Sequence, residues 1–150
     1  MAGFLTNKGA YLLNVGTVIW TSSTIKAMLL KSTATIDQDD NTVSQIVASE
    51  CDATGYVGGF AGADRLTLGT KSTTENDTSN RIEMDAANIP WTAIGGATNN
   101  TLRYVAIIRE NTNDADSDVL GYVQFTSDVN TNGGDVTAQI DVAGVFNLTT

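Results

Sequence analysis

Apolar and polar residues alternate most clearly in the last third of the chain. The run Asp135–Val142 has an apolar residue at every second position, which predicts a strand with one face on a core and the other in water. Leu102–Ile108 carries apolar residues on both faces, which predicts a strand covered on both sides, and Val119–Phe125 is a third such run. The polar loop Glu110–Asp118 and the turn Asn132-Gly133-Gly134 separate these runs. Together they predict a continuous antiparallel meander.

The beginning of the chain has helical spacing instead. Apolar or long side chains recur at offsets of four, seven and eight from Phe4, which predicts a short amphipathic helix over about Leu5–Leu13. Gly9 lies in its middle, where glycine disfavours a helix, and Gly16 is the residue expected to end it. The alternative for this segment, residues 1–16, is a strand or an extended arm that docks on a neighbouring subunit.

Three elements are predicted before the middle of the chain. Ile25–Leu30 is rich in apolar residues and predicts a strand, and Thr17–Trp20 is a candidate for an earlier one. A mostly polar loop follows, and then Thr42 and Gln45 have the spacing of a capping box. This spacing predicts a short helix at about Val43–Ala48.

The centre of the chain combines short strands with polar stretches. Arg65–Leu68 alternates as a short strand, Lys71–Asn80 contains no apolar residue and predicts a loop, and a new strand begins at Ile82. Pro90, the single proline, confines the piece around it to an edge, a bulge or the start of a strand. The whole pattern predicts one mainly β domain, residues 1–150. Its fold is expected to be an antiparallel β-sandwich or a partly closed barrel of about seven or eight strands with one or two short helices.

Composition and charge exclude several classes of partner. The formal charge of −9 argues against a surface that neutralises phosphates, so we expect no nucleic acid partner. No apolar run reaches the length of about 18 residues that a membrane-spanning helix needs, so we expect no membrane partner. The first residues lack the charged and apolar regions of a signal peptide, and we expect a soluble chain made in a cytoplasm.

The absence of histidine removes most catalytic arrangements. Ser-His, Cys-His and His-metal sites are all impossible in this sequence. Cys51 lies between Glu50 and Asp52, whose negative charges raise a thiol pKa, so we expect a buried and unreactive thiol with no disulfide. We therefore expect no enzyme, no catalytic residue and no cofactor.

Acidic residues recur at spacings that partly match known sites. Asp37–Asn41 and Asp114–Asp118 place oxygen ligands at alternate positions as a calcium loop does, but both lack its glycine and its final glutamate. Both predict solvated acidic loops and no metal site. Glu83 and Asp85 flank Met84, and strand alternation places both carboxylates on the solvent side, where no catalytic pair is expected.

Several short phrases resemble a family of small tailed-phage virion proteins. The phrases, in chain order, are Lys8-Gly9-Ala10, Ser23-Thr24-Ile25-Lys26-Ala27-Met28-Leu29-Leu30, Thr42-Val43-Ser44-Gln45-Ile46, Gly55-Tyr56, Ile89-Pro90-Trp91, Tyr104-Val105-Ala106-Ile107-Ile108, Leu120-Gly121-Tyr122-Val123 and Asn132-Gly133-Gly134-Asp135-Val136-Thr137. The resemblance implies a head decoration, or cement, protein that binds the outside of a capsid shell and stabilises it.

That resemblance also implies partners. They are the major capsid protein or other virion proteins, together with a homo-oligomer, for which a trimer at a three-fold position is our expectation. The localisation implied is the surface of the virion head, after synthesis in the host cytoplasm. The segments expected to supply the interface are the N-terminal one, with Phe4, Leu5 and Tyr11, and the edge piece with Pro90 and Trp91.

Two other classes remain open. A phage neck or tail-tube-like subunit would share this composition, but it would assemble into rings or tubes. A carbohydrate-binding adhesin would use Trp20, Trp91 and the acidic loops at an exposed surface, although tryptophan in a β core is commoner.

Overall fold

The computed structural model describes residues 3–149 and is mainly β. Its strands are β1 (Phe4–Leu5), β2 (Lys26–Lys31), β3 (Leu66–Thr67), β4 (Ser72–Asn76), β5 (Arg81–Asp85), β6 (Ile89–Ile94), β7 (Thr101–Arg109), β8 (Asp118–Asn130), β9 (Gly134–Ala138) and β10 (Phe146–Thr149). One α-helix, α1 (Asn7–Asn14), and two 3₁₀ helices, η1 (Val43–Gln45) and η2 (Val47–Ser49), complete the elements of the described residues. The strands form three antiparallel sheets. No helix among residues 3–149 is both long enough and apolar enough to span a membrane.

A five-stranded sheet in the order β1-β8-β7-β2-β3 carries the core. In this sheet, strand β7 is buried on both faces. Val105 and Ile107 belong to one cluster of buried apolar side chains, and Ala106 and Ile108 belong to another on the opposite face. The predicted strand Leu102–Ile108, covered on both sides, is therefore confirmed.

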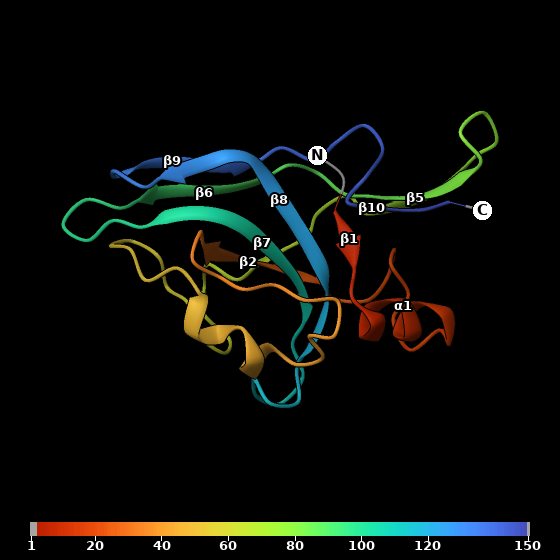
Figure 1. Ribbon diagram of the computed structural model, residues 1–150, viewed down its shortest axis with the longest axis horizontal. Helices are drawn as coiled ribbons and strands as arrows, with labels where there is room; N and C mark the ends of the chain where they lie inside the picture. The colour runs from red at the N-terminus through yellow and green to blue at the C-terminus, as the bar shows by residue number, and fades with distance from the viewer. Residues whose placement is uncertain (1–2, 150) are drawn as a thin grey trace.

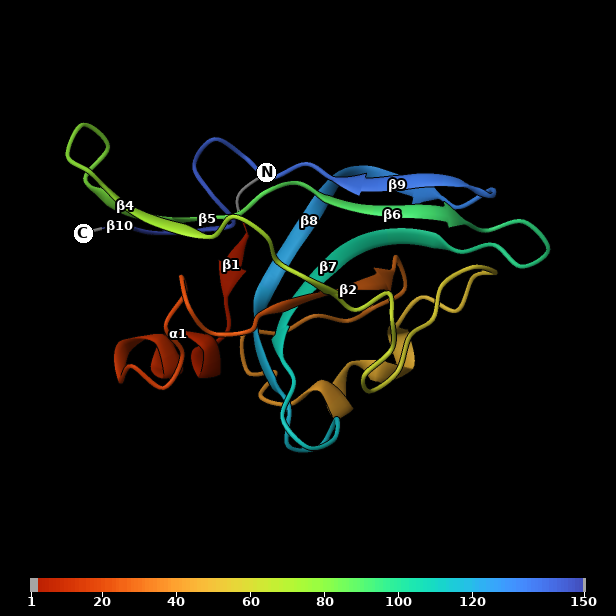
Figure 2. The same cartoon turned by 180° about the vertical axis from the view of Figure 1, so that it is seen from behind.

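Different layers cover the two faces of this sheet. The two-stranded sheet β6–β9 lies over β7 and β8, whereas η1 and η2 lie on the opposite side (Figures 1 and 2). Trp91 and Val136 of the upper layer join the first cluster, and Val43 and Ile46 near η1 join the second. The predicted β-sandwich is confirmed in this form, and the sheets do not close into a barrel.

The third sheet extends away from this body. Strands β10, β5 and β4 pair in that order and project beyond α1 as a narrow arm, with the described end of the chain along it (Figures 1 and 2). We call this three-stranded sheet the arm. Residues 71–80 were expected to be a loop, and this prediction is wrong because β4 lies within them. Its threonines favour strands, and the ladder with β5 satisfies its backbone groups on one side although its side chains are almost all exposed.

Helix α1 lies against β8. Thr6 begins the helix, because its Oγ1 accepts a hydrogen bond from Gly9 N at 2.9 Å and donates one to Val119 O at 2.6 Å. A β-carbon on Gly9 would come within 1.9 Å of Leu120 O, so the residue that weakens the helix also permits its close approach. The predicted helix is confirmed with a later start, since Phe4 and Leu5 pair with β8 as β1. The N-terminal segment 1–16, for which docking on a neighbouring subunit was the alternative, includes residues 1 and 2, which lie outside the described residues.

The predicted final meander is confirmed for β7 and β8, which pair antiparallel, but is wrong for its third strand. Strand β9 pairs with β6 in the covering layer and not with β8, and it ends at Ala138. Beyond it the backbone turns, because Gly144 N donates to Asp141 O at 2.8 Å, and Val142 is 97% exposed. The alternation of residues 135–142 therefore continues in the sequence after the strand has ended.

Other boundaries differ less. The helix expected over Val43–Ala48 is the pair of 3₁₀ turns, and residues 17–20 form turns where a strand was a candidate. Pro90 lies in a two-stranded sheet, in which each strand has a free edge, so its edge position is confirmed. Ten strands form in the described residues where about seven or eight were expected, since β4 and β10 were not predicted and β1 lies where the N-terminal helix was expected. The short strand predicted over Arg65–Leu68 is confirmed as β3.

Candidate functional site

The arm is joined to the body by aromatic packing. Trp20 Nε1 donates to Asp85 O at 2.8 Å, and its ring meets the edge of the Phe146 ring with centroids 5.7 Å apart. Phe146 is fully buried over Gly121, where a β-carbon would come within 2.6 Å of the phenyl ring. These contacts hold the root of the arm in one orientation against the body.

One face of the arm carries an apolar stripe on two of its three strands, β5 and β10. Cross-strand partners share a face, so Phe146, Met84 and Thr73 form one row, and Leu148, Ile82 and Glu75 form the next row outwards. Met84 and Phe146 in the inner row are buried. Leu148 and Ile82 in the outer row are 42% and 37% exposed. The apolar stripe thus continues from the core onto an exposed surface.

A groove of about 500 Å³ separates this face from α1 and the segment that follows it. We call it the arm groove. Its lining consists of Leu5, Ala10, Leu13, Asn14, Gly16, Val18, Ile19, Trp20, Thr73, Met84 and Leu148. None of these residues is charged, although the chain carries 25 acidic and basic residues, the sum of 17 and 8. An uncharged groove in so charged a chain suits an apolar partner.

A second hollow lies at the end of the arm and shares Thr73 with the groove. We call it the tip hollow; its lining is Thr73, Glu75, Asn76, Asp77, Asn80, Arg81 and Ile82. Glu83 binds the Arg81 guanidinium at 2.7 Å, and the hydrogen bonds from Arg81 and Asn76 lower the pKa of that carboxyl. Glu75 and Asp77 have no ion pair within residues 3–149. The tip hollow is therefore acidic.

The charged residues of the body are paired with one another. Arg65 is fully buried and binds Glu50 at 2.8 Å, Asp114 at 2.6 Å and Glu110 at 3.1 Å. Burial lowers the pKa of the guanidinium, but hydrogen bonds to Glu50 and Asp114 raise it further, so the group stays charged. Lys26 also binds Glu110. This network joins the loop before β3 to the 110–118 loop and has a structural role.

The two loops expected to be solvated and acidic are tied to the body. Asp114 binds Arg65, and Asp118 is buried and binds Arg109 at 2.6 Å, so the prediction is wrong for that loop. The 37–41 loop is exposed, but Asp40 accepts a hydrogen bond from the Tyr122 hydroxyl and Asp39 accepts one from the Asn7 side-chain amide. Among residues 3–149, no group of three or more acidic, cysteine or histidine side chains is arranged to hold a metal ion.

Two further expectations concern possible chemistry. Cys51 is buried, which confirms that part of the prediction, and burial raises the pKa of its thiol, which disfavours the reactive thiolate. Glu83 faces away from the apolar row of Met84 and pairs with Arg81, as the alternation predicts. The backbone carbonyl of Asp85 accepts the hydrogen bond from Trp20 Nε1, and its carboxylate accepts a hydrogen bond from Ala86 N at 2.8 Å.

The residues expected at an interface lie in different places. Leu5 lines the arm groove, and Tyr11 on α1 is 61% exposed. Phe4 is 36% exposed and packs on the Tyr122 ring. Pro90 is exposed on the covering layer, whereas Trp91 is fully buried and donates to Asp64 O at 2.7 Å, so it offers no contact surface.

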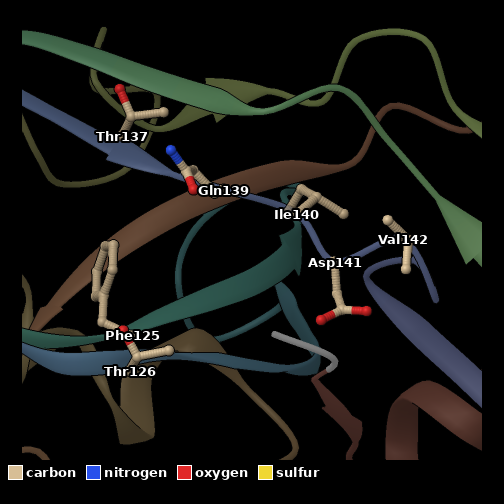
Figure 3. Close-up of a pocket in the computed structure, with 7 residues that line it drawn as sticks. All are labelled: Phe125, Thr126, Thr137, Gln139, Ile140, Asp141 and Val142. Atoms are coloured by element: carbon tan, nitrogen blue, oxygen red, sulfur yellow. The ribbon is translucent and has the colours of Figure 1, made fainter.

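Another hollow lies between the end of β9 and β8 (Figure 3). Thr137, Gln139 and Ile140 line one side of it, and Phe125 and Thr126 line the other. Its polar lining is of the kind that a glycan-binding protein uses, but its aromatic ring, Phe125, is 94% covered. Trp20 and Trp91 are buried as well, so the two tryptophans expected at an adhesin surface are not exposed.

Sequence reasoning missed the central residues of the arm. Ile82 and Leu148 were not identified as surface residues, because an apolar residue at alternate positions of a strand predicts burial. Ile19, which is 56% exposed in the groove wall, lies in the segment that was a candidate strand and was not identified as a surface residue either. The available signal was the polar stretch 71–80 beside Ile82, since a strand without apolar residues cannot belong to a buried sheet.

Comparisons of the chain with protein-family models, with curated proteins and with solved structures found no match.

Proposed function

We propose that this chain is a structural subunit of a tailed-phage virion, a decoration protein that binds the outside of the head and stabilises the shell without catalysis. The resemblance of its short sequence phrases to small virion proteins suggests the setting. The observation that carries the proposal is the arm, in which the apolar side chains of Ile82 and Leu148 are 37% and 42% exposed in the structure of residues 3–149.

The arm has the physical properties that attachment requires. Apolar surface of this kind gains about 25 cal/mol per Å² when a partner covers it. The root contacts of Trp20 and Phe146 fix the arm before binding, so little conformational entropy is lost when the partner docks. A subunit that binds only the mature shell stabilises that shell by mass action.

The runner-up is a neck or tail-tube-like subunit, and one observation favours it. Strands β4 and β10 are both edges of the arm sheet, so each has a free side on which a strand from another copy can pair. Copies joined in this way would form a ring or a tube, and they would do so without a preformed head.

Sedimentation with heads separates these functions. Purified protein is mixed with mature heads that lack it, and the pelleted fraction is measured for the parent chain, for the Leu148→Thr variant and for the Val57→Thr control. Val57 is an exposed apolar residue that lines neither the arm groove nor the tip hollow. We expect saturable binding that Leu148→Thr weakens and Val57→Thr leaves unchanged. Rings or tubes of the protein alone would favour the runner-up, and absence of binding would contradict the proposal.

A further inference from the structure

The arm groove and the tip hollow form one continuous surface with two chemical halves. Thr73 lines both hollows, and Leu148 in the groove is the cross-strand neighbour of Ile82 in the tip hollow. The half near the body contains no charged side chain, whereas the half at the tip contains Glu75 and Asp77 together with Arg81, whose guanidinium is paired with Glu83. A ligand that spans both halves therefore meets apolar contacts at one end and negative charge at the other.

Charge near the tip is unbalanced. The Arg81 guanidinium lies at 2.7 Å from Glu83, and Asn76 donates to the same Glu83 oxygen at 2.8 Å. Glu75 lies in the outer row of the apolar face, directly opposite Ile82. Its carboxylate consequently borders the exposed apolar pair and makes no ion pair within residues 3–149.

We propose that this surface binds an extended segment of a partner protein, in which apolar side chains that fill the arm groove are followed by lysine or arginine at the tip hollow. The inference rests on the proposed function, because it names the chemistry of the shell segment that the arm would contact. Apolar anchors supply the affinity, and the basic residue sets the direction in which the segment lies.

A heterologous partner fits this surface better than a second copy does. A copy of the chain would bring a further charge of −9 towards the two carboxylates, and like charges brought together at an interface oppose binding. The free edge of β4 lies beside the groove, so an extended segment is also able to pair with its backbone.

The test uses the full chain and three short synthetic peptides, followed by NMR spectroscopy. In the first peptide, alternating leucine and threonine precede a pair of lysines. In the second, glutamates replace the lysines, and in the third, threonines replace the leucines. We expect the first peptide to shift the signals of Leu13, Ile19 and Leu148, and to bind at least about tenfold more tightly than either of the other two.

Variants of the chain test separately how the apolar half and the acidic half of the surface contribute to peptide binding. Leu148→Thr should weaken the first peptide about tenfold by removing an apolar anchor. The double change of Glu75→Lys and Asp77→Lys should weaken it similarly and should strengthen the glutamate peptide. Both sites are exposed, so both variants are expected to fold, and Val57→Thr should change nothing.

Three results would overturn the inference. The first is equal binding of the lysine and glutamate peptides. The second is no shift with any peptide. The third is a concentration-dependent shift of the groove signals in the protein alone, since it would mean that the occupant is a second copy. Binding to heads is measured separately, so a chain that pellets with heads but ignores the peptides contradicts only this inference. A chain that binds the lysine peptide but does not pellet with heads contradicts only the decoration function.

Discussion

The body and the arm differ in how far other parts of the chain cover their sheets. The five-stranded sheet is covered on both faces by layers of its own chain, and its buried Arg65 is matched by three carboxylates. The arm sheet is covered only at its root, and its outer row exposes Ile82 and Leu148 beside an unpaired Glu75.

This difference separates a body whose buried groups satisfy one another from an arm whose outer row stays partly exposed. Every buried side-chain polar atom of the described body has a hydrogen-bond partner. In the arm, apolar surface and negative charge both lack a complement among the described residues. We therefore expect substitutions in the body to change stability and substitutions in the arm to change binding.

The largest effect is expected at Arg65. Replacing it with methionine leaves Glu50, Glu110 and Asp114 without their central cation, and we expect a loss of about 3–5 kcal/mol in the free energy of unfolding. The matched control is Arg103→Met, since Arg103 meets Asp128 at 3.4 Å in an exposed pair that contributes about 0–1 kcal/mol. Urea denaturation measures both. Equal losses in the free energy of unfolding would mean that the buried Arg65 network stabilises the body no more than an exposed ion pair does.

The next effect concerns the wall of the groove. Gly9→Ala should favour an isolated helix, yet we expect it to destabilise the protein by about 1–3 kcal/mol, because its β-carbon would overlap Leu120 O. Gly69→Ala, at a site with no neighbour within 4 Å, should stay within about 0.5 kcal/mol. Thermal unfolding compares the two, and a stabilising Gly9→Ala would contradict the close docking of α1.

A smaller effect should appear in the pH dependence. Burial raises the pKa of Glu110, but hydrogen bonds from Lys26 and Arg65 outweigh it and hold the pKa below the unfolded value of 4.5. Because the folded pKa is depressed, this contribution is complete above pH 4.5 and is lost as the pH falls through the lower folded value. Glu110→Gln should therefore reduce the loss of stability that appears as the pH falls below 4.5. Denaturation curves at several pH values test this, and an unchanged slope would exclude Glu110 as a source.

The smallest change in stability is expected in the arm. Ile82→Thr should alter the free energy of unfolding by no more than about 0.5 kcal/mol, because the side chain is already 37% exposed and threonine favours strands. Met84→Thr, on the same face but 4% exposed, should cost at least about 1 kcal/mol. Similar losses for both would show that the outer row is buried in solution.

The sequence predicts the body well because its elements obey local rules. Strands β2, β7 and the first part of β8 are apolar runs, and α1 has helical spacing, so each was predicted close to its observed position. Residues 135–142 show the limit of such rules. Their alternation matches one long strand, but whether β9 pairs with β8 or β6 depends on distant residues such as Trp91, opposite Val136.

The arm could not be predicted for a related reason. Residues 71–76 have the composition of a loop, and only pairing with β5 makes them a strand. Ile82 and Leu148 have the pattern of core residues, and only the projection of their sheet exposes them. A single sequence reports how apolar a position is, whereas exposure depends on what the rest of the chain covers.

Electron cryo-microscopy of heads decorated with this protein tests the central claim most directly. The account predicts density for the chain at regular lattice positions on the head, with the arm groove, including Leu148, against a segment of the shell protein. Density in which the 3₁₀ helices or the β6–β9 layer faces the shell while the arm points into solvent would contradict the assigned surface. Density confined to the neck or tail would contradict the decoration function itself.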